Sequence, residues 1–190
     1  MSTVTVLGAG SWGTALAVHL ARVGHDVRLW ARDRALVDEM KAQRANAVYL
    51  PDIELPESVS VTHGLDRALD ASDLVVSAVP SHGCRAVMRA AKPSMKTGAT
   101  IVSATKGLEA DTLARMSEVI AEEIGSSSSV VVLSGPSFAA EVARKLPTAV
   151  VAASASAEAT EIVQAQFRSL YFRLYGSTDV VGVEIGGALK

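Results

Sequence analysis

The chain has 190 residues, of which 49% are hydrophobic and 20% are charged, and its formal net charge is −2. A chain of this length and composition can bury a substantial core as one α/β domain, and its charge gives no global field that would attract nucleic acid. Cys84 is the single cysteine, which excludes an internal disulfide, and neither a leader pattern nor a membrane-spanning run is evident. We therefore expect a cytoplasmic protein with no nucleic-acid partner and no membrane insertion.

The first elements along the chain are predicted to be a strand, a glycine turn and a helix. The β-branched run at 3–7 ends in glycines, and apolar residues from Trp12 to Val23 recur at helical spacing before Gly24. A second strand is predicted at 26–31. Beyond it the pattern predicts a charged helix at 33–44, an irregular segment at 45–56, strands at 59–62, 73–79, 98–104, 129–134 and 147–154, and a last strand and the start of a helix within 171–190.

This order of elements predicts the class of fold. Strands that alternate with helices form parallel sheets with right-handed crossovers. We expect an α/β protein with a Rossmann-type, doubly wound and mostly parallel sheet. In such a sheet ligands bind outside the carboxyl ends of the strands, so the residues directly after each strand form the candidate site.

The stretch "GAGSWG", from Gly8 to Gly13, follows the first strand and opens the first helix. In the G-x-G-x-x-G pattern Gly8 permits a tight turn, Gly10 lets the backbone approach a pyrophosphate, and Gly13 lets the helix pack closely on the strand. The amides at the helix N-terminus then face the phosphates. A purely structural turn is the alternative, but the place of the motif in a strand–turn–helix unit favours dinucleotide binding.

The end of the second strand, "WARDR", bears on which dinucleotide binds. Arg32 lies 19 positions after Gly13, where a Rossmann site contacts the adenosine ribose. Guanidinium groups match the geometry of phosphate, so Arg32 and Arg34 favour the 2′-phosphate of NADP(H) over NAD(H). Asp33 leaves NAD(H) open, because its carboxylate could accept hydrogen bonds from the ribose hydroxyls instead.

Residues after the later strands are predicted to share the same crevice. Lys106 in "ATKGLE" stands between a strand and Gly107, which would hold its ammonium near a nicotinamide and a small anionic substrate, although such a lysine can also be simply solvated. Ser137 lacks a nucleophile elbow and is expected to have a hydrogen-bonding or turn role. His82 and Cys84 lack metal-ligand spacing and are given no catalytic role. The segments that follow the strands are 8–13, 32–34, 80–84, 105–107 and 135–138.

The motifs "GAGSWGTALA", "YLP", "SATKGLE", "VVLSGPSFAAEVA" and "VEIGGALK" occur in this order along the chain. Together they cover nearly its whole length, and the chain resembles the N-terminal half of bacterial NAD(P)-dependent glycerol-3-phosphate dehydrogenases. The resemblance implies reversible reduction of dihydroxyacetone phosphate to sn-glycerol 3-phosphate by NADPH or NADH, at the entry to phospholipid synthesis. It also implies a homodimer of the full-length protein.

The resemblance further implies roles for individual residues. Lys190 would transfer the proton and Lys106 would contact both cofactor and substrate, while hydride passes from the nicotinamide to the carbonyl carbon. From the residues alone, Lys190 would be an ordinary helix lysine. The remaining implied roles are cofactor binding by Ser11, Trp12, Arg32, Tyr49 and Ala139, and substrate binding by Gly135 and Ser137.

Members of this family continue into an all-helical substrate domain, so we expect a cofactor domain at 1–178 and the start of the helical domain at 179–190. The chain would then be truncated, would bind NADP(H) with little or no turnover, and would expose Val180, Val183 and Leu189 together with Ile185 as an apolar patch. Two alternatives stay open: another NADP-dependent small-acid dehydrogenase, and a stand-alone nucleotide sensor without chemistry.

Overall fold

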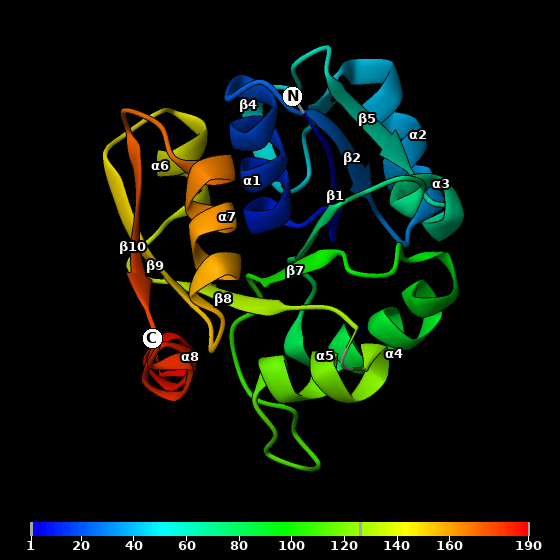
Figure 1. The fold of residues 1–190 in the computed structure, drawn as a ribbon. Helices are drawn as coiled ribbons and strands as arrows, with labels where there is room; N and C mark the ends of the chain where they lie inside the picture. The colour runs from blue at the N-terminus through cyan, green and yellow to red at the C-terminus, as the bar shows by residue number, and fades with distance from the viewer. Residues whose placement is uncertain (1, 126, 190) are drawn as a thin grey trace.

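The structure, a computed structural model, describes residues 2–125 and 127–189. Its centre is an eight-stranded sheet in the order β10-β9-β8-β7-β6-β1-β2-β5, with helices on both faces (Figure 1). The predicted fold class is confirmed. The strands of this sheet are β1 (Thr3–Leu7), β2 (Asp26–Trp30), β5 (Val59–Thr62), β6 (Leu74–Ser77), β7 (Thr100–Ser103), β8 (Val130–Ser134), β9 (Thr148–Ala153) and β10 (Phe172–Ser177).

Two large apolar clusters hold the layers together, one on each face of the sheet, and a small third cluster lies between α1, β4 (Leu50–Glu54) and α6. Val4 and Val6 of β1 belong to the cluster that α1, α2 and α7 cover, whereas Leu7 of the same strand belongs to the cluster under α3, α4 and α5. Because both faces are covered, the central strands are apolar on both sides, as is typical of parallel sheets. The helices are α1 (Ser11–Arg22), α2 (Arg34–Gln43), α3 (Leu65–Leu69), α4 (Ser81–Ala91), α5 (Met116–Ile124), α6 (Ala139–Ala143), α7 (Ala157–Phe167) and α8 (Val180–Ala188), with a 3₁₀ turn at Lys92–Ser94.

The strand order reverses between β1 and β6. From β1 the chain builds outward through β2 to β5, and it then returns to pair β6 with the other side of β1, in parallel. Loops that leave β1 and β6 therefore diverge to opposite faces and leave a crevice at their carboxyl ends. This switch point fixes where a ligand can enter the fold.

One step of the sheet is antiparallel. β8 pairs with β9 in the antiparallel sense, and β9 then pairs with β10 in parallel. The segment between β8 and β9 contains only the five-residue helix α6. The segment therefore leaves β8 and enters β9 at the same end of the two strands. This keeps the "GPSF" residues beside the crevice, where Ser137 and Phe138 line its wall.

The expectation of an irregular segment at 45–56 is wrong. Ala45–Asn46 (β3) and Leu50–Glu54 (β4) form a small antiparallel hairpin outside the main sheet. Pro51 fits there because β4 is an edge strand, where a missing backbone N–H costs little. The hairpin packs against α1 and α2 beside the glycine turn.

Helix α8 is tied to the rest of the fold by a buried carboxylate. Glu184 accepts hydrogen bonds from the backbone N–H of Ser117 at 2.8 Å, from its hydroxyl at 2.5 Å and from the Arg115 guanidinium at 2.8 Å. The expected apolar patch on this helix is only partly present: Leu189 is 83% exposed, whereas Val183 and Ile185, like Val180, are half-buried because α8 packs on β8. None of the described helices combines the length and the apolar character needed to cross a bilayer.

Candidate functional site

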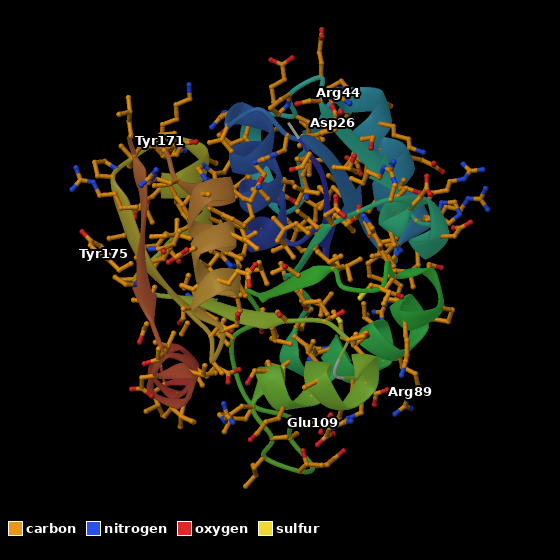
Figure 2. The ribbon with its side chains drawn as sticks, in the orientation of Figure 1. Asp26, Arg44, Arg89, Glu109, Tyr171 and Tyr175 are labelled. Atoms are coloured by element: carbon orange, nitrogen blue, oxygen red, sulfur yellow. The ribbon has the colours of Figure 1, made fainter. Side chains whose placement is uncertain are left out.

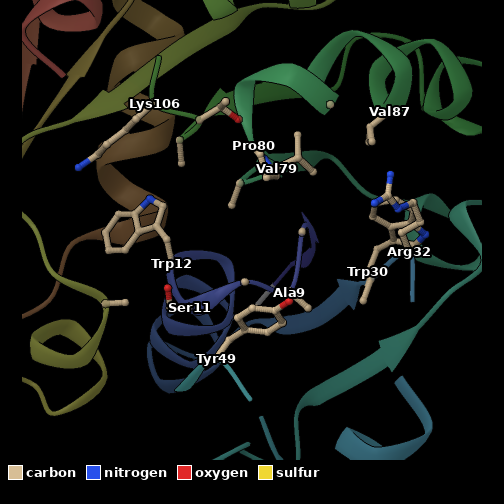
Figure 3. A pocket seen from close by; sticks show the side chains of 18 of the residues that line it. Ala9, Ser11, Trp12, Trp30, Arg32, Tyr49, Val79, Pro80, Val87 and Lys106 are labelled. Atoms are coloured by element: carbon tan, nitrogen blue, oxygen red, sulfur yellow. The ribbon is translucent and has the colours of Figure 1, made fainter. Parts of the chain in front are cut away.

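A crevice of about 690 Å³ opens at the carboxyl ends of β1, β2, β6 and β7 (Figure 3). This volume is within the range of small-molecule and cofactor sites. Each of the five segments that follow a predicted strand contributes to its wall, as the sequence predicts. The lining includes Gly8, Ala9, Gly10, Ser11, Trp12, Trp30, Arg32, Asp33, Tyr49, Ala78, Val79, Pro80, His82, Val87, Thr105, Lys106, Ser137, Phe138 and Ala139.

The three glycines of the turn are required for different reasons. Gly8 has φ +111°, and a Cβ there would lie 2.7 Å from the carbonyl oxygen of Ala78. A Cβ on Gly13 would lie 1.8 Å from the carbonyl oxygen of Gly8, so α1 could not pack against the turn. A Cβ on Gly10 would meet no atom of the other described residues within 4 Å, its two chain neighbours aside. Packing therefore explains Gly8 and Gly13, whereas the bare backbone at Gly10 only leaves space in the crevice.

Gly10 is also the N-cap of α1, and it provides no capping side chain. The first residues of this twelve-residue helix, Ser11 and Trp12, line the crevice, and in the described part of the chain no side-chain hydrogen bond caps the helix. Helix N-termini of this kind attract anionic groups through their unpaired N–H groups and the helix dipole. The turn is suited to receive a phosphate.

The two arginines after β2 are placed differently. Arg32 lines the crevice, whereas Arg34 is the exposed first residue of α2 and lies outside the lining formed by the described residues. Asp33 is the N-cap of α2, where its Oδ1 accepts hydrogen bonds from the backbone N–H groups of Ala35 at 2.8 Å and Leu36 at 3.3 Å. One oxygen of the carboxylate that could compete for a ribose hydroxyl is thus occupied by the helix.

Lys106 connects three walls of the site. It follows β7, its Nζ lies 3.4 Å from the carbonyl oxygen of Gly135 after β8, and it stands 5.9 Å from the ring centre of Trp12 on α1. The indole Nε1 of Trp12 is buried and has no hydrogen-bond partner among the described residues. A cation at this point, where the loops of two strands meet, can contact an anionic ligand in the crevice.

The remaining predicted site residues lie around this centre. Ser137 is buried in the crevice wall, and Tyr49 is half-exposed at its rim. Gly135, with φ +149°, lines a separate apolar cavity of about 460 Å³ between β8 and α8. Lys190 lies outside the described residues.

Burial accounts for the inertness assigned to Cys84. Cys84 belongs to α4 and its side chain is fully buried, and this burial raises the pKa of the thiol to about 11. A thiol in that state stays protonated at neutral pH and is a poor nucleophile. In the described part of the chain no group of three His, Cys, Asp or Glu side chains could hold a metal ion.

Two supporting contacts were not predicted from the sequence. Arg85 on α4 forms a two-pronged ion pair with Glu109, at 2.7 and 2.8 Å, which anchors the loop that carries Lys106 to α4. This partner lowers the pKa of Glu109 to about 2. Figure 2 labels Glu109 in this loop. The side-chain amide of Asn46 on β3 donates a hydrogen bond to the carbonyl oxygen of Ala9 in the glycine turn. The sequence signal for the first contact is Glu109, the last residue of the motif "TKGLE". The segment around Asn46 has no periodic pattern from which the second contact could be predicted.

Comparison with known proteins agrees with this site. The sequence model of the family described as NAD-dependent glycerol-3-phosphate dehydrogenase N-terminus matches residues 3–160. The chain belongs to this family. The resemblance predicted from the motifs is thereby confirmed.

Named glycerol-3-phosphate dehydrogenases match nearly the whole chain. It is 49% identical over 98% of its length to glycerol-3-phosphate dehydrogenase [NAD(P)+] of Thermoanaerobacter sp. strain X514, and 50% identical over its full length to a second such protein from Salinibacter ruber. The crystal structure of the Coxiella burnetii glycerol-3-phosphate dehydrogenase superposes with a TM-score of 0.93 at 39% identity, covering 98% of this chain and 57% of that one. The chain spans 56% of the length of the two curated relatives.

Proposed function

We propose that the crevice binds NADP(H), and that residues 1–178 are the cofactor domain of a glycerol-3-phosphate dehydrogenase that interconverts dihydroxyacetone phosphate and sn-glycerol 3-phosphate. The observation that carries the proposal is Gly10. It lies at an uncapped helix N-terminus, and its missing side chain serves no packing contact. A pyrophosphate is the group that such an arrangement accommodates.

The proposal assigns the residues of the crevice as follows. The amides at the start of α1 bind the pyrophosphate, Arg32 binds the 2′-phosphate, and Ser11, Trp12, Tyr49 and Ala139 complete the cofactor contacts. When bound, the nicotinamide supplies or accepts the hydride.

Lys106 stabilises negative charge on the carbonyl oxygen of the substrate and orients it, with Gly135 and Ser137 nearby. Lys190 transfers the proton to or from that oxygen. We place residues 179–190 at the start of a helical substrate domain, and we assign the full-length protein to the cytoplasm as a homodimer.

The arrangement after β2 supports a preference for NADPH over NADH. Arg32 faces the crevice, and the Asp33 oxygen that caps α2 is not available to a ribose hydroxyl. A guanidinium at this point has a phosphate as its best partner, since each charge-assisted hydrogen bond contributes about 1.5–3 kcal/mol.

Fluorescence titration of NADPH and NADH into this chain tests the proposal. We expect NADPH to bind more tightly, and Arg32→Gln to weaken NADPH about 10- to 100-fold while leaving NADH nearly unchanged. Arg34→Gln is the matched control, because it removes the same charge two residues away from outside the crevice. Absence of binding by the unmodified chain would overturn the proposal, and equal effects of the two substitutions would overturn the role of Arg32.

A further inference from the structure

The side chain of Asn46 joins three segments beneath the crevice. It is fully buried, and its Nδ2 donates to the carbonyl oxygen of Ala9 at 2.9 Å and to Oγ1 of Thr14 at 2.8 Å. Its Oδ1 accepts a hydrogen bond from the backbone N–H of Tyr49 at 3.1 Å. Both N–H groups of the amide are therefore used. One side chain ties the β3–β4 hairpin to the glycine turn and to the first turn of α1.

The bond to Ala9 constrains the peptide that continues into Gly10. In a trans peptide the C=O and N–H groups point in opposite directions, so holding the Ala9 carbonyl toward Asn46 directs the Gly10 N–H away from it. Ala9 and Gly10 line the crevice, whereas Asn46 is buried behind them. The contact thus sets the orientation of the peptide that a phosphate would approach, at a glycine whose own conformation is otherwise permissive.

The same amide also positions a second wall of the crevice. Tyr49, whose backbone Asn46 holds, lines the crevice with 50% of its surface exposed. Figure 3 shows Tyr49, Ala9 and Ser11 around the same opening. Because a rigid amide spans the two, the position of Tyr49 and the conformation of the turn depend on each other.

We infer that Asn46 is a positioning residue for the cofactor: it holds the glycine turn in the conformation that receives the pyrophosphate and keeps Tyr49 in register with it. This inference rests on the proposed binding of NADP(H). A residue that merely stabilised the hairpin would affect folding and would affect every ligand alike. The two roles can be separated by comparing ligands with and without a pyrophosphate.

The chain offers matched variants for this comparison. Asn46→Asp keeps the shape but sets a carboxylate oxygen against the Ala9 carbonyl. Thr14→Val removes one acceptor of the amide, and Thr14→Ser retains it. Arg44→Gln is the control. Arg44 precedes the same hairpin and donates to the backbone carbonyl oxygens of Leu55, directly after the hairpin, and of Val59 on β5, and it lies outside the crevice lining of the described chain.

The experiment measures the Kd of each variant for NADPH and for adenosine 2′-monophosphate, which lacks the pyrophosphate, alongside thermal unfolding. We expect Asn46→Asp to raise the NADPH Kd about 10-fold, the effect of a buried polar group that loses its partner, with adenosine 2′-monophosphate unaffected. Thr14→Val should raise the NADPH Kd in the same selective way, Thr14→Ser should restore it, and Arg44→Gln should lower the melting temperature alone.

The outcomes separate a failure of the proposed function from a failure of the positioning role of Asn46. If the unmodified chain does not bind NADPH, the proposed function itself fails. The positioning role is wrong if the unmodified chain binds NADPH and both Asn46→Asp and Thr14→Val bind NADPH as tightly as it does. It is also wrong if these variants lose affinity for both ligands in parallel. Should Asn46→Asp fail to fold, the contrast between Thr14→Val and Thr14→Ser decides by the same criterion.

Discussion

At the scale of single residues, the glycine turn separates packing from ligand binding. The spacing of the motif assigns three roles to Gly8, Gly10 and Gly13, but all three positions look alike in the sequence. The structure distinguishes them by what a methyl group would meet: backbone atoms at Gly8 and Gly13, and open space at Gly10. Substitutions within residues 8–13 should therefore affect the stability of the fold at Gly8 and Gly13, and the affinity for the ligand at Gly10.

Two alanine substitutions test this separation. Gly13→Ala forces a methyl group against the Gly8 carbonyl and should lower the free energy of unfolding by about 1–3 kcal/mol. Gly10→Ala should change it by less than about 1 kcal/mol, yet weaken NADPH about 10-fold or more, because the methyl group projects where the pyrophosphate approaches. Urea unfolding and fluorescence titration measure the two quantities. An NADPH Kd for Gly10→Ala equal to that of the unmodified chain contradicts the assignment.

In the candidate site, residues that follow strands could be predicted from the sequence. Buried residues that hold the loops in place by hydrogen bonds could not. Arg32, Lys106 and Ser137 are recognisable because each comes directly after a strand. Asn46 is not, since its role depends on a buried hydrogen bond to Ala9 across 37 positions of sequence. Periodicity carries no information about such a bond.

At the scale of elements, a buried histidine joins α1 to α7 and β10. His19 is fully buried, its Nε2 lies 2.7 Å from the Phe167 carbonyl oxygen, and its Nδ1 lies 2.9 Å from the hydroxyl of Tyr171, which Figure 2 places at one end of β10. Its ring centre is 4.4 Å from that of Phe172. Burial is the main cause that lowers the pKa of His19 to about 4.

This shift makes stability depend on pH. Between about pH 6.5 and 4 the unfolded chain binds a proton at His19 that the folded chain does not, so stability falls as the pH falls through this range. The loss is on the order of 3 kcal/mol, and it is absent above about pH 6.5. Urea unfolding at several pH values measures it. His19→Gln should flatten the dependence, whereas the exposed His82 gives the control variant His82→Gln; equal pH profiles for all three proteins would refute the assignment.

The order of elements was predictable from alternation, but their pairing was not. Strand-like runs identify β9 correctly, yet the sequence does not record that it runs antiparallel to β8. The β3–β4 hairpin was missed because β3 has two residues and β4 contains a proline, so neither shows a clear alternation.

At the scale of the whole molecule, the crevice lies where the two halves of the sheet meet. Its walls come from loops after β1 and β2 on one side and after β6, β7 and β8 on the other. A dinucleotide bound there contacts both halves at once. Binding to the folded state alone raises the free energy of unfolding by mass action.

The molecule as a whole should therefore be stabilised by its cofactor. At a concentration 100 times its Kd, NADPH should add about 2.7 kcal/mol, which corresponds to a rise in melting temperature of about 5–10 °C for a domain of this size. Differential scanning fluorimetry with NADPH and NADH at equal concentrations should show the larger rise for NADPH. A melting temperature that does not change with NADPH would speak against a crevice formed in the native state.

The buried carboxylate of Glu184 joins α8 to residues that lie far from it in the sequence. The loop that carries Lys106 ends at Arg115, and Arg115 and Ser117 are the groups that hold Glu184 on α8. Glu184 is buried, so these hydrogen bonds are shielded from competing water. The last helix is therefore fastened to the far end of the loop that carries Lys106.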